Sequence, residues 1–384
     1  MMDTFMDPLI AARAQFPITR HLIYLDSANM NSPPDCVTQT LADYYTAIQT
    51  HGGDKRAWGA TVAATRAKAA QLLGCDTGEV AFCKNTSEGI NIAANAIDWR
   101  PGDNVVLPAS EHPNNVFPWL NLRRHGVEIR MIPQTENWVG PDLLGPHIDS
   151  RTRVVAVADV SFHPGQRNDL PGLAELCRRV GAHLVVDGVQ AVGLREVDLR
   201  NSGIAMWAAS GHKGLLCPHG IGLFYCRSDL IPALAPAYAA RASMVPAPGD
   251  DHVVREIDVP FAPDAQRFEI GNHNYSGIYA MGAALDLLLG IGIGTIEQHI
   301  TTLAAYLTDR LAAHGVSRLG PADPRRWSSI CAYDPPGDGW VEYFAANNII
   351  VSGRLGGLRV SLGVHNNIED LDNFVEILSR RLKP

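Results

Sequence analysis

The sequence predicts an α/β fold, in which a mostly parallel sheet forms a large domain and a smaller α+β domain follows it. Three observations support this prediction. Between about residues 80 and 226, apolar runs of strand length alternate with helix-like stretches. Residues 235–254, APAYAARASMVPAPGDDHVV, are rich in alanine and proline and are typical of an exposed connection. After that connection, long stretches with helical spacing of apolar residues dominate.

The predicted large domain spans residues 20–288 and contains seven strand-like runs. They are EVAFCK (79–84), DNVVLP (103–108), VEIRMI (127–132), TRVVAVADVSF (152–162), HLVVDGVQ (183–190), IAMWAAS (204–210) and GIGLFYC (220–226). The intervening stretches SEGINIAANAI (87–97) and DLPGLAELCRRVG (169–181) have helical spacing. Strands with helices between them imply βαβ crossovers, and therefore a sheet covered on both faces.

The predicted smaller domain comprises residues 289–384 and is joined by the N-terminal residues 1–19. The helix-like stretches after the connection are SGIYAMGAALDLLLGIG (276–292), which crosses this predicted boundary, TIEQHITTLAAYLTDRLAAHG (295–315) and IEDLDNFVEILSRRL (368–382). LRVSLGV (358–364) is strand-like. This mixture predicts an α+β arrangement.

Composition narrows the class of protein. The 384 residues are 46% hydrophobic and carry a formal net charge of −8, which argues against nucleic acid or an anionic membrane as the main partner. No apolar run is long enough to cross a bilayer, and the acidic start does not resemble a secretory signal. The seven cysteines are scattered, which is typical of reduced thiols. We therefore expect a cytoplasmic protein.

Polar groups follow several of the predicted strands, at the sheet edge where α/β proteins bind ligands. Thr86 and Ser87 begin a helix and could hold a phosphate, although both are also ordinary N-capping residues. Asp187 ends a central strand, where a carboxylate needs a cation or a donor unless it caps the next helix. Lys213 follows the next strand as a candidate nucleophile, or as a lysine that extends to solvent. Together these groups match pyridoxal 5'-phosphate, which needs an amine, an acid and phosphate donors.

The sequence also resembles the class V aminotransferases, the fold-type-I group that includes cysteine desulfurases, kynureninase and isopenicillin N epimerase. The motifs that carry the resemblance are VVDGVQAVG (185–193), SGHKG (210–214) and RFEIGNHNYSGI (267–278). The similarity extends over nearly the whole chain, from YLDSANMNSPP (24–34) to LRVSLGVHNNIEDLDNFVEIL (358–378). It implies a seven-stranded-type sheet, a pyridoxal 5'-phosphate cofactor, an amino-acid substrate and a homodimer with active sites at the subunit interface.

The resemblance also implies a role for individual residues. Lys213 is then the Schiff-base lysine and Asp187 the partner of the pyridinium nitrogen, while Gln190 faces the phenolic oxygen. Thr86, Ser87, Ser210 and His212 form the phosphate site, Asn272 reaches the phosphate of the neighbouring subunit, and Arg359 binds the substrate α-carboxylate. In EHPNNVFPW (111–119), His112 is expected to stack on the cofactor ring. The alternative is that His112 only forms hydrogen bonds within its loop.

Two departures from the desulfurase pattern bear on the reaction. Residues 347–361, NNIIVSGRLGGLRVS, lack the cysteine that desulfurases carry before the carboxylate-binding arginine. We therefore predict that the chain is not a persulfide-forming cysteine desulfurase. The segment DVSFHPGQRNDLPGL (159–173) is more similar to kynureninase and the epimerase. On that similarity, Phe162, Arg167 and Arg354 shape the substrate side.

The favoured reaction is β-elimination or a related C–S lyase-type cleavage, in which the freed Lys213 removes the α-proton. Epimerisation and transamination are the alternatives, because both begin with the same deprotonation. Two interpretations from other classes remain. A zinc module of His212, Cys217 and His219 lacks a fourth ligand. A non-catalytic protein that keeps the fold would have no need to retain Lys213 and Asp187 together.

Overall fold

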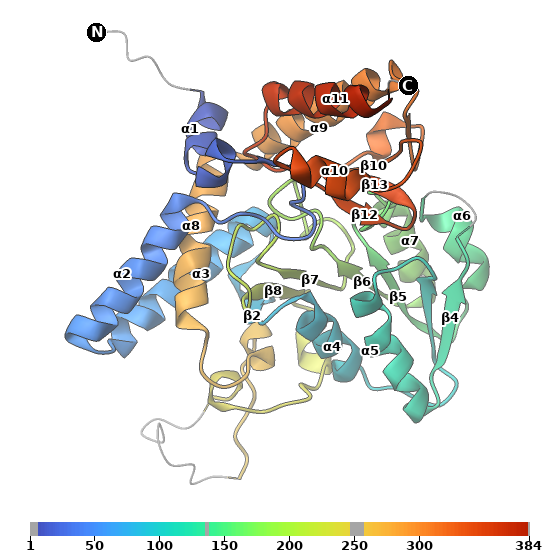
Figure 1. The fold of residues 1–384 in the computed structure, drawn as a ribbon. Helices are drawn as coiled ribbons and strands as arrows, with labels where there is room; N and C mark the ends of the chain where they lie inside the picture. Colours follow the sequence, from blue (N-terminus) through green and yellow to red (C-terminus); the bar gives the residue numbers. More distant parts are fainter. Residues whose placement is uncertain (1–6, 135–137, 246–256, 383–384) are drawn as a thin grey trace.

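The fold is described from a computed structural model, which places residues 7–134, 138–245 and 257–382 (Figure 1). Its centre is a seven-stranded sheet with the strand order β2-β8-β7-β6-β5-β3-β4. The strands are β2 (Val80–Cys83), β3 (Asn104–Pro108), β4 (Glu128–Ile132), β5 (Thr152–Ala158), β6 (His183–Asp187), β7 (Met206–Ser210) and β8 (Gly222–Cys226). Only β8 runs antiparallel to its two neighbours, and the other pairs are parallel.

The sheet is buried on both faces because alternate residues of each strand enter two different hydrophobic clusters. Val155 and Val157 of β5 pack in a cluster with helices α3 (Lys55–Leu73), α7 (Leu170–Val180) and α8 (Tyr275–Ile291). Val154 and Ala156 face the other cluster, which contains α4 (Thr86–Ala96) and α5 (Phe117–Leu120). This layering explains the nearly continuous apolar runs of the strands.

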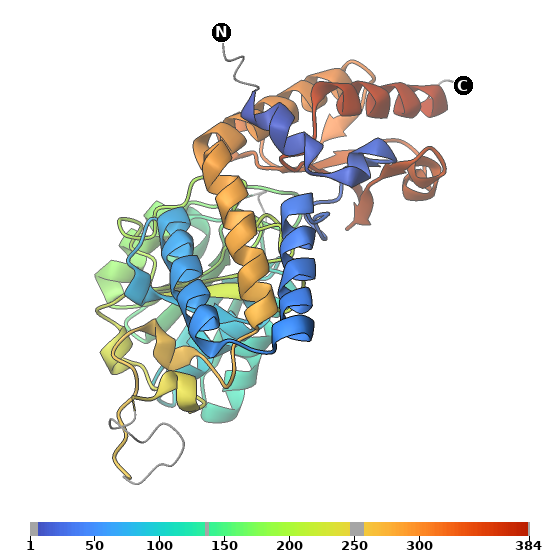
Figure 2. The same ribbon diagram turned by 90° about the vertical axis from the view of Figure 1, so that its left-hand side faces the viewer.

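The N-terminal helices cover one side of the large sheet. Helix α2 (Asp35–His51) and α3 pack against α8, and Figure 2 shows the three side by side. Helix α6 (Pro141–Leu144) is a short turn near α7. Among the described residues no single helix is long and apolar enough to cross a membrane; α8 and α9 (Ile293–Ala312) meet that test only together, across a 74° bend.

The C-terminal part is built on a four-stranded antiparallel sheet with the order β12-β13-β10-β9. Its elements, together with the short strand β11, are α9, β9 (Ser317–Arg318), β10 (Ile330–Asp334), α10 (Trp340–Ala346), β11 (Ile349–Ile350), β12 (Ser352–Arg354), β13 (Gly357–Ser361) and α11 (Ile368–Leu382). The turn between β12 and β13 consists of Leu355 and Gly356, both with positive φ, as a tight two-residue hairpin requires.

The N-terminal segment packs against this C-terminal part, as Figure 2 shows. Strand β1 (Ile23–Tyr24) pairs in parallel with β11. Arg13 of α1 (Pro8–Ala14) forms an ion pair with Asp370 of α11, with 2.8 Å between Nη1 and Oδ2. Residues from both ends of the chain therefore meet above the carboxyl ends of the large sheet.

The α/β fold class and the mostly parallel seven-stranded sheet are confirmed. Each of the seven predicted strand-like runs contains one strand of that sheet. The predicted division at residues 288 and 289 falls in the last turn of α8, and the division into two domains stays a prediction. The predicted connection 235–254 lies partly outside the described residues.

Candidate active site

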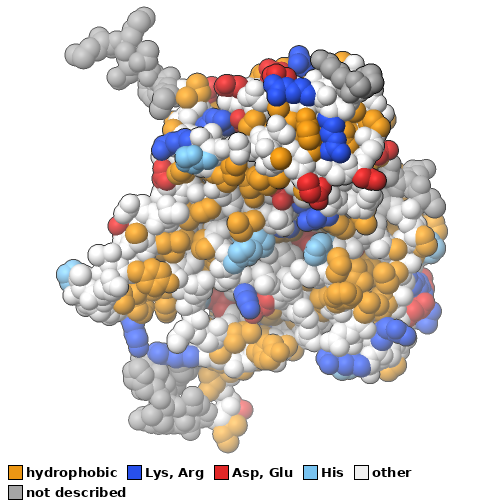
Figure 3. Space-filling view, in the orientation of Figure 1, with side chains coloured by type: hydrophobic (Ala, Val, Ile, Leu, Met, Phe, Trp, Pro, Cys, Tyr) orange, Lys and Arg blue, Asp and Glu red, His pale blue; other side chains and the backbone are white. Residues whose placement is uncertain are grey.

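A cavity of about 450 Å³ lies at the carboxyl ends of the central strands, and Arg354 of β12 and Arg359 of β13 are part of its lining. Figure 3 shows basic and histidine side chains beside the hollow in the middle of this face. The cavity is lined by Ala28, Asn29, Thr86, Ser110, Glu111, His112, Pro113, Asn114, Val139, Ala158, Val160, Ser161, Phe162, Gln166, Asn168, Asp187, Val189, Gln190, Ser210, His212, Lys213, Arg354 and Arg359. Ten of the thirteen residues assigned to the site from the sequence are in this set.

One end of the cavity is formed by the first turn of α4 and the end of β7. The backbone N–H of Thr86 donates to Ser210 Oγ at 2.8 Å, and the N–H of Ser210 donates to Thr86 Oγ1 at 2.9 Å. Helix α4 can come this close to β7 because residue 89 is glycine, where a Cβ atom would lie 2.4 Å from the Cβ of Ala208. A helix N-terminus with two hydroxyl groups offers the donors and the positive dipole end that an anion needs.

Asp187 is the last residue of β6 and is buried, with 5% of its surface exposed. Its Oδ1 accepts a hydrogen bond from the backbone N–H of Val189 at 3.0 Å. Burial raises the pKa of this carboxyl to about 6. No Lys or Arg nitrogen of the described residues lies within 4 Å of the carboxylate. Asp187 is therefore a buried acid without a Lys or Arg partner at ion-pair distance in the described part of the chain.

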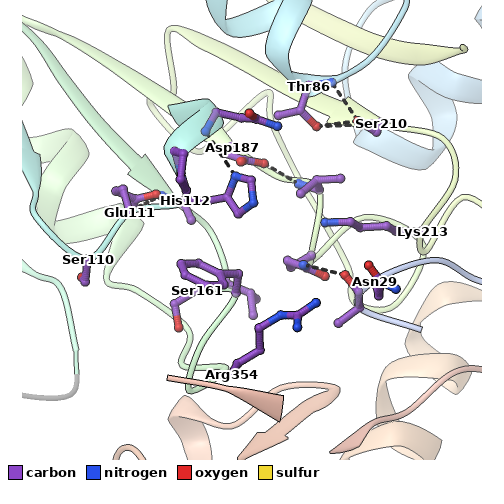
Figure 4. Close-up of a pocket in the computed structure, with 18 of the residues that line it drawn as sticks. Asn29, Thr86, Ser110, Glu111, His112, Ser161, Asp187, Ser210, Lys213 and Arg354 are labelled. Carbon is purple, nitrogen blue, oxygen red and sulfur yellow. Dashed lines mark hydrogen bonds between the residues drawn. The ribbon is translucent and has the colours of Figure 1, made fainter. Parts of the chain in front are cut away.

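Lys213 lies in the turn after β7, and Figure 4 shows its side chain reaching into the cavity. Desolvation lowers the pKa of this amine to about 8, an effect that the negative charge of Asp187 partly offsets. The preceding His212 stacks on His219, with 4.1 Å between the ring centroids. A desolvated amine with a lowered pKa can act as a nucleophile and as a base.

His112 and Gln190 occupy the cavity between these groups. The Nδ1 atom of His112 accepts the N–H of Asn114 at 3.2 Å, and its ring meets Phe162 edge to face at 5.3 Å. Burial and the positive charge of Lys213 lower the pKa of His112, so that the imidazole is neutral at neutral pH. Gln190 donates from Nε2 to the carbonyl oxygen of Ala28 at 3.0 Å.

Two arginines enter the cavity from the β12–β13 hairpin. Arg359 of β13 is buried, and its Nη2 lies 3.3 Å from Oδ1 of Asp26. Its Nη1 also donates to the carbonyl oxygen of Phe162 at 3.2 Å. Arg354, the last residue of β12, is half-buried and points into the cavity from the side opposite Thr86 and Ser210 (Figure 4). A fork of guanidinium donors is suited to a carboxylate.

Three residues named from the sequence lie outside the cavity lining. Ser87 is on the first turn of α4, and Asn272 is exposed and lines a separate pocket with Lys84. The role expected of Asn272 concerns a second subunit and stays a prediction. Arg167 was expected on the substrate side, and this placement is wrong, because its guanidinium forms an ion pair with Glu297 of α9 at 2.7 Å.

The alternative zinc module has no support in the geometry. Cys217 is buried, and its thiol donates to the carbonyl oxygen of Leu215 at 3.0 Å. His212 and His219 stack face to face, instead of converging on a point. Within residues 7–134, 138–245 and 257–382, no group of three or more His, Cys, Asp and Glu side chains is arranged to hold a metal ion.

Sequence reasoning missed Glu111, although it lies three residues after the end of β3, at the same edge of the sheet as Asp187 at the end of β6. Its Oε1 accepts the backbone N–H of Ala158 at 2.8 Å, and its Oε2 accepts from Asn115 Nδ2 at 3.0 Å. Desolvation is the largest influence on this carboxyl and raises its pKa to about 7. The signal was present in the rule on strand ends that singled out Asp187.

We expect Glu111 to make the cofactor-free protein less stable as the pH rises from about 4.5 to about 7. In this window the folded state holds a proton that the unfolded state has released, because the pKa in the folded protein lies above the usual 4.5. In the Glu111→Gln variant, the decrease in the free energy of unfolding over this pH range should be smaller by about 1–3 kcal/mol. Urea unfolding at several pH values measures it.

The control for this experiment is Glu175→Gln, which removes an exposed carboxylate of α7. Arg178 and Arg179 lower the pKa of Glu175 to about 2, so its titration lies below the window. The decline should therefore persist in this variant. Equal declines in Glu111→Gln and in the unchanged protein would contradict the assignment.

Comparison with known proteins gives a consistent result. A family model described as Aminotransferase class-V matches residues 23–337. The chain is 30% identical over 368 residues to an uncharacterized protein of Schizosaccharomyces pombe, covering 94% of this chain and 84% of that protein. It is 33% identical over 294 residues to a probable cysteine desulfurase of Methanothermobacter thermautotrophicus, covering 75% and 72%. The structure of the Escherichia coli cysteine desulfurase CsdA superimposes with a TM-score of 0.86 at 26% identity, covering 99% of both chains.

Proposed function

The chain belongs to the aminotransferase class-V family, a family of pyridoxal 5'-phosphate enzymes, and on that premise we propose that it cleaves the side chain of an α-amino acid by β-elimination. One observation carries the proposal. The cavity contains a reactive amine, Lys213, and a buried acid, Asp187, but none of the seven cysteines of the chain lines it. The C–S lyase type of cleavage is the form of this reaction that we favour.

The residues present fit the cofactor. The buried carboxylate of Asp187, which has no cation within ion-pair distance among the described residues, would hold the protonated ring nitrogen. Thr86 and Ser210, with His212 beside them, would hold the phosphate at the N-terminus of α4. Lys213 would hold the aldehyde. Each group of the cofactor thus has a partner of the right chemistry in one cavity.

The bound cofactor supplies an electron sink for the bond that breaks at the α-carbon. The protein supplies the proton transfer and the orientation. Lys213 Nζ removes the α-proton, which its lowered pKa allows near neutral pH. Arg359 orients the α-carboxylate, and the neutral ring of His112 covers the reacting centre. Loss of the α-proton and of a β-substituent, followed by hydrolysis, gives pyruvate and ammonia from a three-carbon substrate.

One of the reported relatives is named as a probable cysteine desulfurase and another as a cysteine desulfurase, which conflicts with the prediction that this chain forms no persulfide. The observation that supports elimination is that no cysteine lines the cavity. A persulfide on the protein requires a thiol that can reach the substrate. The hairpin between β12 and β13 has a two-residue turn without cysteine, which supports a different fate for the sulfur. Cys36 is half-buried on α2, and the other six cysteines are buried. Burial also raises the thiol pKa of Cys75 and Cys177 to about 12.

A panel of β-substituted amino acids tests the proposal. With the purified holoenzyme we expect β-chloro-L-alanine and L-cystine to release pyruvate and ammonia in equal amounts. Incorporation of solvent deuterium at the α-carbon without pyruvate would instead indicate epimerisation. Transfer of the amino group to a 2-oxo acid would indicate transamination, and either result would overturn elimination.

The proposal includes a homodimer with active sites at the subunit interface. Asn272 is exposed beside Asn274 and Lys84, where a second chain could approach it. In that arrangement its side-chain amide completes the phosphate site of the neighbouring subunit.

A further inference from the structure

We propose that Arg354 binds a second carboxylate at the end of the substrate side chain, so that the preferred substrates are amino acids with an acidic side chain. This inference rests on the proposed function and names its substrate class.

Most charged groups of the cavity already have partners. Arg359 is engaged by Asp26, with 3.3 Å between Nη2 and Oδ1. Both carboxylate oxygens of Glu111 accept hydrogen bonds from the protein. Asp187 and Lys213 influence each other electrostatically, and both have a place in the cofactor chemistry.

Arg354 differs from these groups. The only hydrogen bond of its guanidinium within the described part of the chain goes from Nη1 to the carbonyl oxygen of the neighbouring Gly353, at 2.8 Å. No described Asp or Glu lies within ion-pair distance of it. Its positive charge nevertheless reaches the centre of the cavity, because it contributes to lowering the pKa of His112 and of Lys213. Arg354 thus brings to the cavity a positive charge that no Asp or Glu of residues 7–134, 138–245 and 257–382 pairs with at ion-pair distance.

The hairpin register keeps the two arginines apart on one face. Ser352 pairs with Arg359, and Arg354 pairs with Gly357. Paired residues of antiparallel strands point to the same side, so Arg354 and Arg359 share a face as diagonal neighbours. Diagonal positions are separated by about 7–8 Å, a spacing that suits two carboxylates of one short amino acid better than one carboxylate shared by both arginines.

The part of the cavity wall near Arg354 is polar and suits a polar substrate side chain. Figure 4 shows Ser110, Ser161 and Asn29 around the half of the cavity from which Arg354 enters, away from Thr86 and Ser210. The phosphate and the distal carboxylate would therefore lie at opposite ends. This separation avoids repulsion between the two anions.

Binding titrations of the holoenzyme test the inference. The probes are pairs of equal size, L-aspartate with L-asparagine and L-glutamate with L-glutamine, and the readout is the change in cofactor absorbance. We expect the acidic member of at least one pair to bind about tenfold or more tightly than its amide, as a charge-assisted hydrogen bond implies. In Arg354→Gln this ratio should approach one, and Arg354→Lys should retain part of it.

Two further variants separate Arg354 from its surroundings. Arg359→Gln should weaken both members of each pair, because both carry the α-carboxylate. Leu355→Ala changes an exposed side chain at the tip of the same hairpin and should leave the ratio unchanged. Circular dichroism of each variant shows whether the fold is retained.

Two outcomes would overturn the inference alone: no preference for the acidic amino acids in the unchanged protein, or equal weakening of both members by Arg354→Gln. The second would mean that both arginines bind one α-carboxylate. A protein that forms no chromophore with pyridoxal 5'-phosphate would overturn the proposed function itself. The two failures are therefore distinguishable.

Discussion

Replacing Lys213 by alanine should abolish turnover and covalent attachment of the cofactor. The chain has only five lysines, and among the described ones Lys213 alone reaches into the cavity. Removal of a base that transfers the α-proton costs about 10²–10⁴-fold in kcat, and the loss of the covalent link adds to this. Borohydride reduction followed by peptide mass spectrometry should find the cofactor on Lys213 in the unchanged protein and on no residue of the variant.

Two control variants test whether the effect of Lys213→Ala comes from the loss of the nucleophile at this position. Lys213→Arg keeps the positive charge but not the nucleophile, because a guanidinium is not deprotonated in proteins. It should be as inactive as the alanine variant, which separates covalent chemistry from electrostatics. Lys68→Ala removes a partly exposed lysine that pairs with Asp286 and should remain fully active. Trapping of the cofactor on a lysine other than Lys213 would disprove the assignment.

The second large effect is expected for Asp187→Asn. The amide keeps an acceptor for the N–H of Val189 but cannot hold a positive ring nitrogen. We expect kcat to fall by about 10²–10³-fold, the range found when one electrostatic contact to a developing charge is removed. Steady-state kinetics and the cofactor spectrum measure the effect.

The free energy of unfolding of Asp187→Asn shows whether a loss of activity results from a loss of stability. Burial raises the pKa of Asp187 to about 6, so the folded protein loses stability as the pH rises from about 3.8 to about 6. Asparagine has no proton to lose, and the cofactor-free variant should be at least as stable as the unchanged protein at neutral pH. Asp286→Asn, at an exposed site on α8, should change neither property. A loss of activity that merely follows a loss of stability would refute the role of Asp187.

The large sheet could be predicted because its signals are local. Each strand is a short apolar run, and the polar residues that end β6 and β7 stand out against it. Because ligands bind at the carboxyl ends of parallel strands, the sequence predicted that Asp187, Ser210 and Lys213 belong to one site. All three line the same cavity in the structure.

The parts that sequence reasoning did not reach depend on distant pairings. Helices α2 and α3 have weakly apolar faces that become recognisable only against α8. The pairing of Asp26 with Arg359 joins residues that are 333 positions apart, and no local pattern indicates it. Arg167 lies in a segment assigned to the substrate side by similarity, but Glu297, on a distant helix, binds it.

The ion pair between Asp26 and Arg359, which joins the two ends of the chain, has a consequence for biosynthesis. Asp26 leaves the ribosome hundreds of residues before the hairpin that carries Arg354 and Arg359, so the central sheet can form while the carboxylate-binding wall does not yet exist. Closing a loop of this length costs conformational entropy before its contacts can stabilise the fold. A nascent or truncated polypeptide would therefore contain Lys213 and Asp187 but lack the two arginines that bind the substrate carboxylates. We expect such a chain to have no activity on amino acids.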